Sequence, residues 1–147
     1  QQVDTPERIY EAPSSAYVAD FIGEVNIIEG RSVAQGETVR ISWAEGQPEI
    51  IGTPSAPLPD GPVTFLIRPE KVAISAEKPA DRKNAIQGKV LDIAYLGNLS
   101  TYHVQLPGGQ IIKAQAANAR RRASLAFTWE DTVWLSWTDT AGVVLAR

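Results

Sequence analysis

The sequence predicts a mainly β protein, a small barrel or sandwich with a short helical segment at its N-terminus. Beyond residue 23, almost every apolar stretch is short and bounded by Gly or Pro, a texture typical of small β-barrels and sandwiches. Residues 37–43 alternate apolar Val39, Ile41 and Trp43 with polar residues, the pattern of a strand with one buried face. Helix signals are confined to the first residues.

The helical segment is predicted by its start and stop residues. Thr5 suits a helix N-cap and Pro6 the first helical position, where no N–H is needed, and Pro13 ends this first helix. A second short helix is expected before Gly23, which is suited to close it. Its apolar residues at i, i+3 and i+4 spacing are Val18, Phe21 and Ile22.

The rest of the chain is expected to form short strands in sequence. They are residues 24–30, 37–43, 49–51, 63–67, 71–75, 85–96, 99–106, 110–116, 132–138 and 143–146. The Gly- and Pro-rich residues 44–62 are otherwise a loop. Gly88 and Gly97 interrupt strand-like stretches and mark a bulge or a sharp corner. We find no convincing internal repeat in the sequence.

Composition excludes several classes of site. The chain has no Cys and one His, so disulfide frameworks, Cys-ligated zinc, thiol catalysis and His clusters are excluded. It has no Met, which suits a piece of a longer protein. The net charge of −3 is uneven, because residues 1–77 carry −7 and residues 78–147 carry +4. This unevenness indicates either two solvated faces or a contact surface that pairs opposite charges.

Residues 106–110 read LPGGQ, which is similar to the LSGGQ signature of ABC ATPases but has Pro107 in place of the serine. The flanking stretches look like strands, so Gly108 and Gly109 are predicted to form a hairpin turn. The sequence contains no G-x-x-x-x-G-K-[ST] phosphate loop. We therefore expect no nucleotide-binding, metal or catalytic residue in this chain, and no cofactor.

Two features are candidate domain or subunit contacts. Arg68 and Glu70 flank Pro69, either as a strand end whose charges are paired locally or as a polar anchor at a contact. Trp134 and Trp137 are three positions apart, so in one strand they point to opposite faces. One of them is then expected in the core and the other at the surface or an interface.

Two further sets of residues could bind nucleic acid, but their sequence context favours a solvated loop or core packing. Residues 120–122 are three arginines that either grip phosphates or lie in a solvated loop. Tyr95, Tyr102 and His103 lie near basic residues, as in the stacking platforms of single-strand-binding OB folds. Tyr102 is in phase with the apolar residues of its strand and is predicted to face the core, with His103 facing out.

Several short sequence motifs together resemble those of one protein family. Residues 5–13 and 17–23, TPERIYEAP and YVADFIG, resemble the segment that closes the ATPase domain of polyamine-type ABC importers. Further words follow in the family's order: RPE at 68–70, GKV at 88–90, YLG at 95–97, YHVQL at 102–106 and VWLSW at 133–137. The chain is similar to the C-terminal regulatory (TOBE, transport-associated OB) domain of such ATP-binding subunits.

This resemblance implies an OB-like small β-barrel and two parts. Residues 1–23 would be the helical C-terminal stub of a nucleotide-binding domain, and residues 24–147 the regulatory domain. The parent chain would be a transport ATPase that uses ATP and Mg and works as a homodimer. It would bind permease subunits at the cytoplasmic face of the bacterial inner membrane, as a peripheral protein that does not insert into it.

In that context the barrel would regulate opening and closing of the ATPase pair, and hold it together, through barrel contacts. The imported solute would be a polyamine or a similar small molecule. The alternative is a stand-alone OB-type module that binds an oxyanion or single-stranded nucleic acid. The acidic pI of about 5.2 disfavours nucleic acid as a partner.

Overall fold

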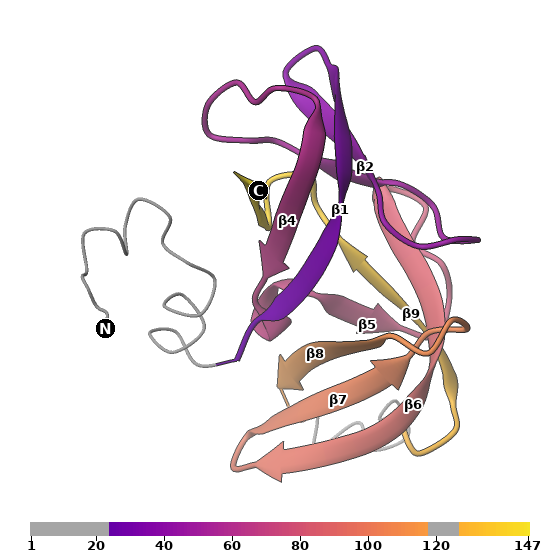
Figure 1. Cartoon of the computed structure of the whole chain (residues 1–147). Coiled ribbons are helices and arrows are strands. Elements are labelled where there is room, and N and C mark those ends of the chain that lie inside the picture. The colour runs from indigo at the N-terminus through magenta and orange to yellow at the C-terminus, as the bar shows by residue number, and fades with distance from the viewer. Residues whose placement is uncertain (1–23, 118–126) are drawn as a thin grey trace, which may run out of the picture.

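The computed structural model describes residues 24–117 and 127–147, which form two antiparallel five-stranded sheets (Figure 1). The first sheet has the order β10-β4-β1-β2-β3 and the second β5-β9-β6-β7-β8. The strands of the first are β1 (Asn26–Gln35), β2 (Thr38–Ser42), β3 (Ile50–Gly52), β4 (Gly61–Ile67) and β10 (Val143–Ala146). Those of the second are β5 (Ala73–Ser75), β6 (Asn84–Leu96), β7 (Leu99–Gln105), β8 (Ile111–Ala117) and β9 (Thr132–Trp137). The 3₁₀ turn η1 (Pro69–Lys71) joins β4 to β5.

Two predictions fall outside the described residues: the helical segment 1–23 and the three arginines at 120–122. The predicted strands are all present, and most of their ends shift by one or two residues. β1 extends past Gly30 to Gln35 because its second half pairs with β2 in a hairpin. Lys71, predicted to open a strand, instead ends η1.

The two sheets have the same plan, which corrects the expectation that the chain has no internal repeat. β1 pairs with β2 and β4, and β2 with β3, just as β6 pairs with β7 and β9, and β7 with β8. Each sheet is completed by a strand from the other half of the chain. β5 pairs with β9, and β10 pairs with β4. The first repeat (β1–β5) and the second repeat (β6–β10) therefore exchange their last strands.

The repeats correspond residue by residue at their starts. Asn26 opens β1 opposite Ile67, and Asn84 opens β6 opposite Trp137. Four residues later come Gly30 and Gly88, where an added Cβ would collide with the backbone oxygen of the neighbouring hairpin strand. The hairpin turns also agree, since Gly36 and Gly97 have φ of 68° and 61°, which favour glycine.

Each sheet curls until its outer strands approach each other, which gives two OB-like barrels. In the second sheet β5 lies against β8. In the first, a Cβ on Gly52 of β3 would lie 2.9 Å from Cγ2 of Val144 in β10. The strand order with a partly open seam is that of a five-stranded OB barrel. The prediction of a mainly β, OB-like fold is confirmed.

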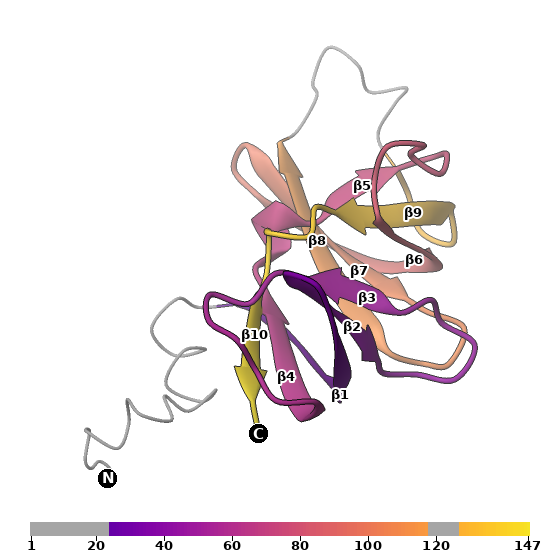
Figure 2. The same ribbon diagram turned by 90° about the horizontal axis from the view of Figure 1, so that it is seen from above.

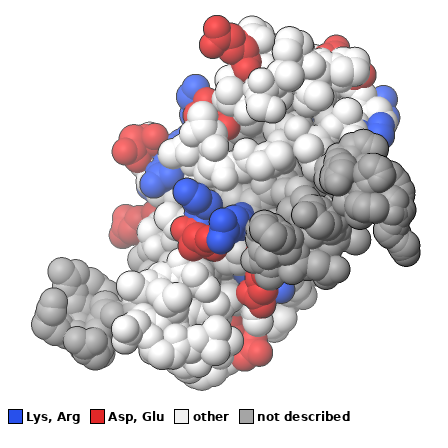
Figure 3. Space-filling view, turned by 90° about the vertical axis from the view of Figure 1, so that its left-hand side faces the viewer, with Lys and Arg blue, Asp and Glu red and all other residues white. Residues whose placement is uncertain are grey.

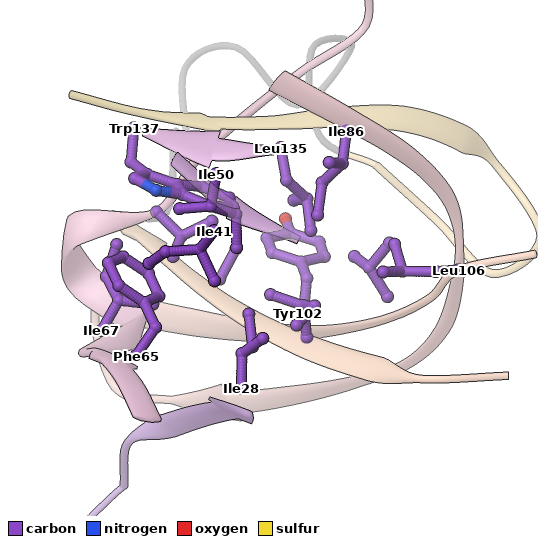
Figure 4. Close-up of a cluster of buried hydrophobic side chains, with 14 of the residues drawn as sticks. Ile28, Ile41, Ile50, Phe65, Ile67, Ile86, Tyr102, Leu106, Leu135 and Trp137 are labelled. Atoms are coloured by element: carbon purple, nitrogen blue, oxygen red, sulfur yellow. The ribbon is translucent and has the colours of Figure 1, made fainter. Parts of the chain in front are cut away.

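One hydrophobic cluster runs through both sheets, which lie against each other in Figure 2. Phe65 of β4 and Trp137 of β9 stack across the junction, with ring centroids 6.2 Å apart and an interplanar angle of 26°. Figure 4 shows Ile28 and Phe65 from the first sheet beside Tyr102 and Leu135 from the second. Because the core is shared, the two repeats form one packed unit.

Candidate functional site

Two buried asparagines join the repeats, and both stand at the first position of a strand. Asn84 Oδ1 accepts a hydrogen bond from the Ile51 N–H (2.7 Å), and its Nδ2 donates to the Ile51 oxygen (2.9 Å). Asn26 makes the same pair with Lys113, at 2.8 and 2.9 Å. Each amide thus hydrogen-bonds to the backbone of a strand in the other sheet. Asn84 bonds to β3, and Asn26 bonds to β8.

Sequence reasoning missed these asparagines. The signal that marks them is the shared pattern N-x-I-x-G at residues 26–30 and 84–88. Asparagine suits the position because its amide carries both a donor and an acceptor and imitates a paired strand residue. The bonds also cover strand edges that would otherwise present open backbone groups.

Arg68 and Glu70 form an ion pair, with Nη2 and Oε2 2.8 Å apart. Pro69 between them is buried and opens η1, so the two side chains flank a fixed turn. Both side chains are about half exposed, and pairs of this kind contribute about 0–1 kcal/mol. The pair therefore contributes little to stability and remains available at the surface as a candidate contact.

A hollow of about 520 Å³ lies beside this turn, where the seam between β5 and β8 meets the β9–β10 connection. Its polar lining comes from Glu70, Lys71, Arg82, Gln115, Thr138 and Thr140. The lining includes two cationic side chains and one carboxylate, Glu70, which is paired with Arg68. The charge balance and the hydroxyl groups suit a small anion.

The two candidate tryptophans occupy opposite faces of β9, as their spacing predicts. Trp137 is 1% exposed and belongs to the core. This corrects its place among the candidate contacts, because an enclosed side chain cannot reach a partner. Trp134 is partly exposed on the outer face, and the Lys78 ammonium lies 5.5 Å from its ring centroid. Such cation–π contacts are worth about 0.5–1 kcal/mol at exposed sites.

The aromatic residues do not assemble into a stacking platform. Tyr102 is buried, as predicted, and packs edge-on against Phe127 at 6.0 Å. Tyr95 is exposed at the end of β6, and His103 is half-buried. Because one tyrosine belongs to the core, these side chains offer no continuous aromatic surface for nucleic-acid bases.

The predicted turns and corners lie where strands meet. Gly109 donates its N–H to the Leu106 oxygen, and Leu106 donates to Gln110, each at 2.8 Å. The LPGGQ stretch, with Gly108 at its centre, is thus a turn between β7 and β8. Gly97 closes the β6–β7 hairpin, and Gly88 lies inside β6 where the strands approach closely.

Charged side chains are mixed on the visible face. In Figure 3, acidic and basic side chains lie next to one another in a band across the middle. Ion pairs connect the acidic and basic parts of the chain: Lys113 Nζ lies 3.7 Å from Glu24, and Arg147 Nη1 lies 3.5 Å from Glu29. Within residues 24–117 and 127–147, no group of three or more His, Asp or Glu could hold a metal ion. In the same residues, no helix has the length and apolar character of a membrane span.

The TOBE domain family matches residues 65–145, more than half of the chain. The chain belongs to this family. The matched region starts inside β4 and ends inside β10, so it takes in the second repeat and the end of the first. The TOBE domain of this chain therefore includes two interlocked repeats, and the family match covers all but the last residue of the second.

Curated relatives match the TOBE chain over nearly its whole length. The putrescine transport ATP-binding protein PotG of Escherichia coli (strain K12) is 40% identical over 146 residues, which are 98% of this chain and 39% of that protein. The spermidine/putrescine import ATP-binding protein PotA of Nitrosomonas eutropha is 34% identical over 147 residues, 99% of this chain and 40% of that protein. PotA of Thermobifida fusca is 34% identical over 146 residues. The chain spans about two-fifths of the length of these relatives.

A solved structure supports the fold. The cytoplasmic molybdate-binding protein ModG, in a crystal form with molybdate bound, has a TM-score of 0.68 to this chain. The similarity covers 83% of this chain and 96% of that one, at 13% sequence identity. At that identity the likeness establishes the OB-like architecture alone.

Proposed function

We propose that this chain is the C-terminal regulatory domain of the ATP-hydrolysing subunit of an ABC importer for polyamines or a similar small solute. The observation that carries the proposal is the 40% identity with PotG over 98% of the chain. ATP and Mg bind elsewhere in the parent subunit, which pairs with a second copy and with permease subunits. The parent acts at the cytoplasmic face of the bacterial inner membrane. Residues 24–147 form the regulatory domain, and residues 1–23 end the nucleotide-binding domain.

In this role the TOBE domain acts through its surface. Contacts between barrels bias the balance between open and closed ATPase pairs. The surface groups that we propose for such contacts are the Arg68–Glu70 pair and Trp134. Each combines a charge with a rigid group. Arg68 and Glu70 flank Pro69, and Lys78 lies over the indole ring of Trp134.

The test uses the full-length subunit, reconstituted with its permease in vesicles. ATP hydrolysis and putrescine uptake are measured for the parent, for Trp134→Ala and for Arg68→Ala. We expect the variants to keep hydrolysis and to lose at least threefold in uptake per ATP. The control is Gln105→Ala, an exposed residue of β7, which does not pair with β9. A parent subunit that hydrolyses no ATP overturns the proposed function. An unchanged ratio of uptake to ATP hydrolysis in both variants overturns the proposed contact role.

A second candidate function, oxyanion binding, is favoured by the hollow beside η1. Lys71, Arg82, Thr138 and Thr140 supply two charges and two hydroxyl groups to its lining. Calorimetric titration with molybdate, sulfate and phosphate tests it. We expect a Kd that weakens at least tenfold in Arg82→Ala, and the absence of measurable heat with all three anions rules the candidate out.

A further inference from the structure

Three of the four sheet edges are covered by other parts of the described chain. The outer edges of β3 and β8 each receive an asparagine amide, at the backbone groups of Ile51 and Lys113. The edge strand β5 lies against β8. Such cover protects backbone groups that would otherwise pair with another strand. The fourth edge is β10, which lies beside β4 at the end of the first sheet (Figure 2).

The outward backbone groups of β10 belong to Val144 and Ala146. Arg147 donates its N–H to the Pro62 oxygen of β4, so the backbone groups of alternate residues, 143, 145 and 147, point towards β4. Those of the two residues between them point away from the sheet. Within residues 24–117 and 127–147, no hydrogen bond joins these outward groups to another residue. The neighbouring strand β3 ends at Gly52, beside Val144, and Ala146 lies beyond it and is exposed.

The second repeat shows that the fold is able to cover this edge. Its equivalent strand is β5, where Ser75 lies opposite Trp134 as Leu145 of β10 lies opposite Thr64. After β5 the chain turns, and the Ser75 hydroxyl donates to the Glu77 oxygen at 2.8 Å. One repeat thus has a covered edge strand, and the other leaves the matching strand as a template for pairing.

The β10 edge also lacks the side chains that usually prevent pairing. Natural edge strands are protected by charged residues or proline, whereas β10 reads VVLA. Val143 is 54% exposed and Leu145 is half-buried. The nearest cation, Arg147, is turned back across the sheet, since its guanidinium donates to the Val63 and Gly30 oxygens at 3.1 Å each. The edge is therefore apolar and carries no charge against a second strand.

We propose that β10 pairs with β10 of a second copy of this chain, in antiparallel orientation about a twofold axis at Leu145. Val144 then lies opposite Ala146 of the second copy, and Ala146 opposite its Val144. This register uses both N–H groups and both oxygens of each copy. Leu145 meets its own counterpart on the outer face, and the two first sheets become one continuous sheet. Because the contact is the same on both copies, it closes as a dimer and does not extend into a fibre.

This inference rests on the proposed function, in which the parent subunit brings two copies of the barrel together. Stable interfaces bury about 1,200–2,000 Å² in total, more than a pair of four-residue strands provides. Two copies held by the rest of the parent meet at an effective concentration in the millimolar range, where a weak contact forms. The β10 edge thus gives the barrel contacts of the parent a location and a register.

The absence of cysteine allows a test with single introduced cysteines, at millimolar concentration of the chain. In the proposed register Leu145 and its counterpart form a non-hydrogen-bonded pair with Cα atoms about 4.5 Å apart, within disulfide range. Val143 is more exposed but lies four residues, about 13 Å, from its counterpart. We expect Leu145→Cys to form disulfide-linked dimers at least tenfold faster than Val143→Cys. Equal rates, or a faster Val143→Cys, as exposure alone predicts, overturn the pairing.

Two further variants of the Leu145→Cys chain separate backbone pairing from collision. Ala146→Pro removes one outward N–H but none of the hydrogen bonds to β4, and should slow dimer formation at least tenfold. Ala146→Ser keeps the N–H and should leave the rate unchanged, and equal rates in these two variants overturn the pairing. Failure of the proposed function is distinguishable, because a parent that hydrolyses no ATP leaves the disulfide rates of this chain unaffected.

Discussion

Replacing Asn84 with alanine removes the two hydrogen bonds that join the start of β6 to Ile51 of β3. A lost hydrogen bond between neutral groups costs about 0.5–1.5 kcal/mol, and a buried group left without a partner costs about 1–3 kcal/mol. Ile51 is half-buried, so water satisfies its freed backbone groups in part. Two groups at about 1–2 kcal/mol each give an expected loss of about 2–4 kcal/mol in the free energy of unfolding.

Urea unfolding of the chain, followed by tryptophan fluorescence, measures this loss by linear extrapolation. The matched control is Gln87→Ala, an exposed amide three positions along the same strand, which should change stability by less than about 0.5 kcal/mol. Asn26→Ala should cost the same as Asn84→Ala, because its amide makes the same two bonds to Lys113. If Asn84→Ala is no more destabilising than Gln87→Ala, the asparagines do not join the repeats.

Four other predictions concern stability and follow from single contacts. Gly88→Ala places a Cβ 2.6 Å from the Gln105 oxygen and should cost about 1–3 kcal/mol by urea unfolding. Trp137→Ala opens a cavity in the shared core and should cost about 3–5 kcal/mol. Trp134→Ala, on the outer face of the same strand, should cost about 1 kcal/mol or less in the same assay, and equal losses for the two tryptophans would contradict their placement. Arg68→Ala breaks an exposed ion pair. Its free energy of unfolding should therefore fall by no more than about 1 kcal/mol, and its thermal midpoint should shift only by the corresponding small amount.

Most of the strands were predictable because local alternation and Gly or Pro punctuation define them. The opposite faces of Trp134 and Trp137 and the core position of Tyr102 follow from the two-residue period of a strand. The pattern also indicates which tryptophan faces inward, because Trp137 is in phase with Val133 and Leu135, whereas Trp134 is in phase with Thr132 and Ser136. The aromatic partner of Trp137 did not follow from the sequence, because Phe65 comes from the other sheet.

The repeat was not predictable because strand pairing across the chain creates it. β6 is longer than β1, 13 residues against 10, so the two halves lose their alignment after Gly30 and Gly88. The exchanged strands β5 and β10 place equivalent residues in different sheets. Only the short N-x-I-x-G pattern survives in both halves, and its meaning depends on backbone groups 33 and 87 residues away.

The same long-range bonds decide how the TOBE domain must behave as a unit. Each sheet contains a strand from the other repeat, and one core serves both. Neither repeat can therefore open without exposing part of the other. Coincident unfolding is the expected behaviour of such a unit.

Hydrogen exchange of the whole chain in increasing urea tests this claim most directly, with amides of β4 in the first repeat compared with amides of β9 in the second. Interlocked repeats predict that both sets exchange through one opening with one free energy and one urea dependence. Exchange of either set through a separate opening, lower by about 2 kcal/mol or more, would show that the repeats unfold independently and would contradict the account.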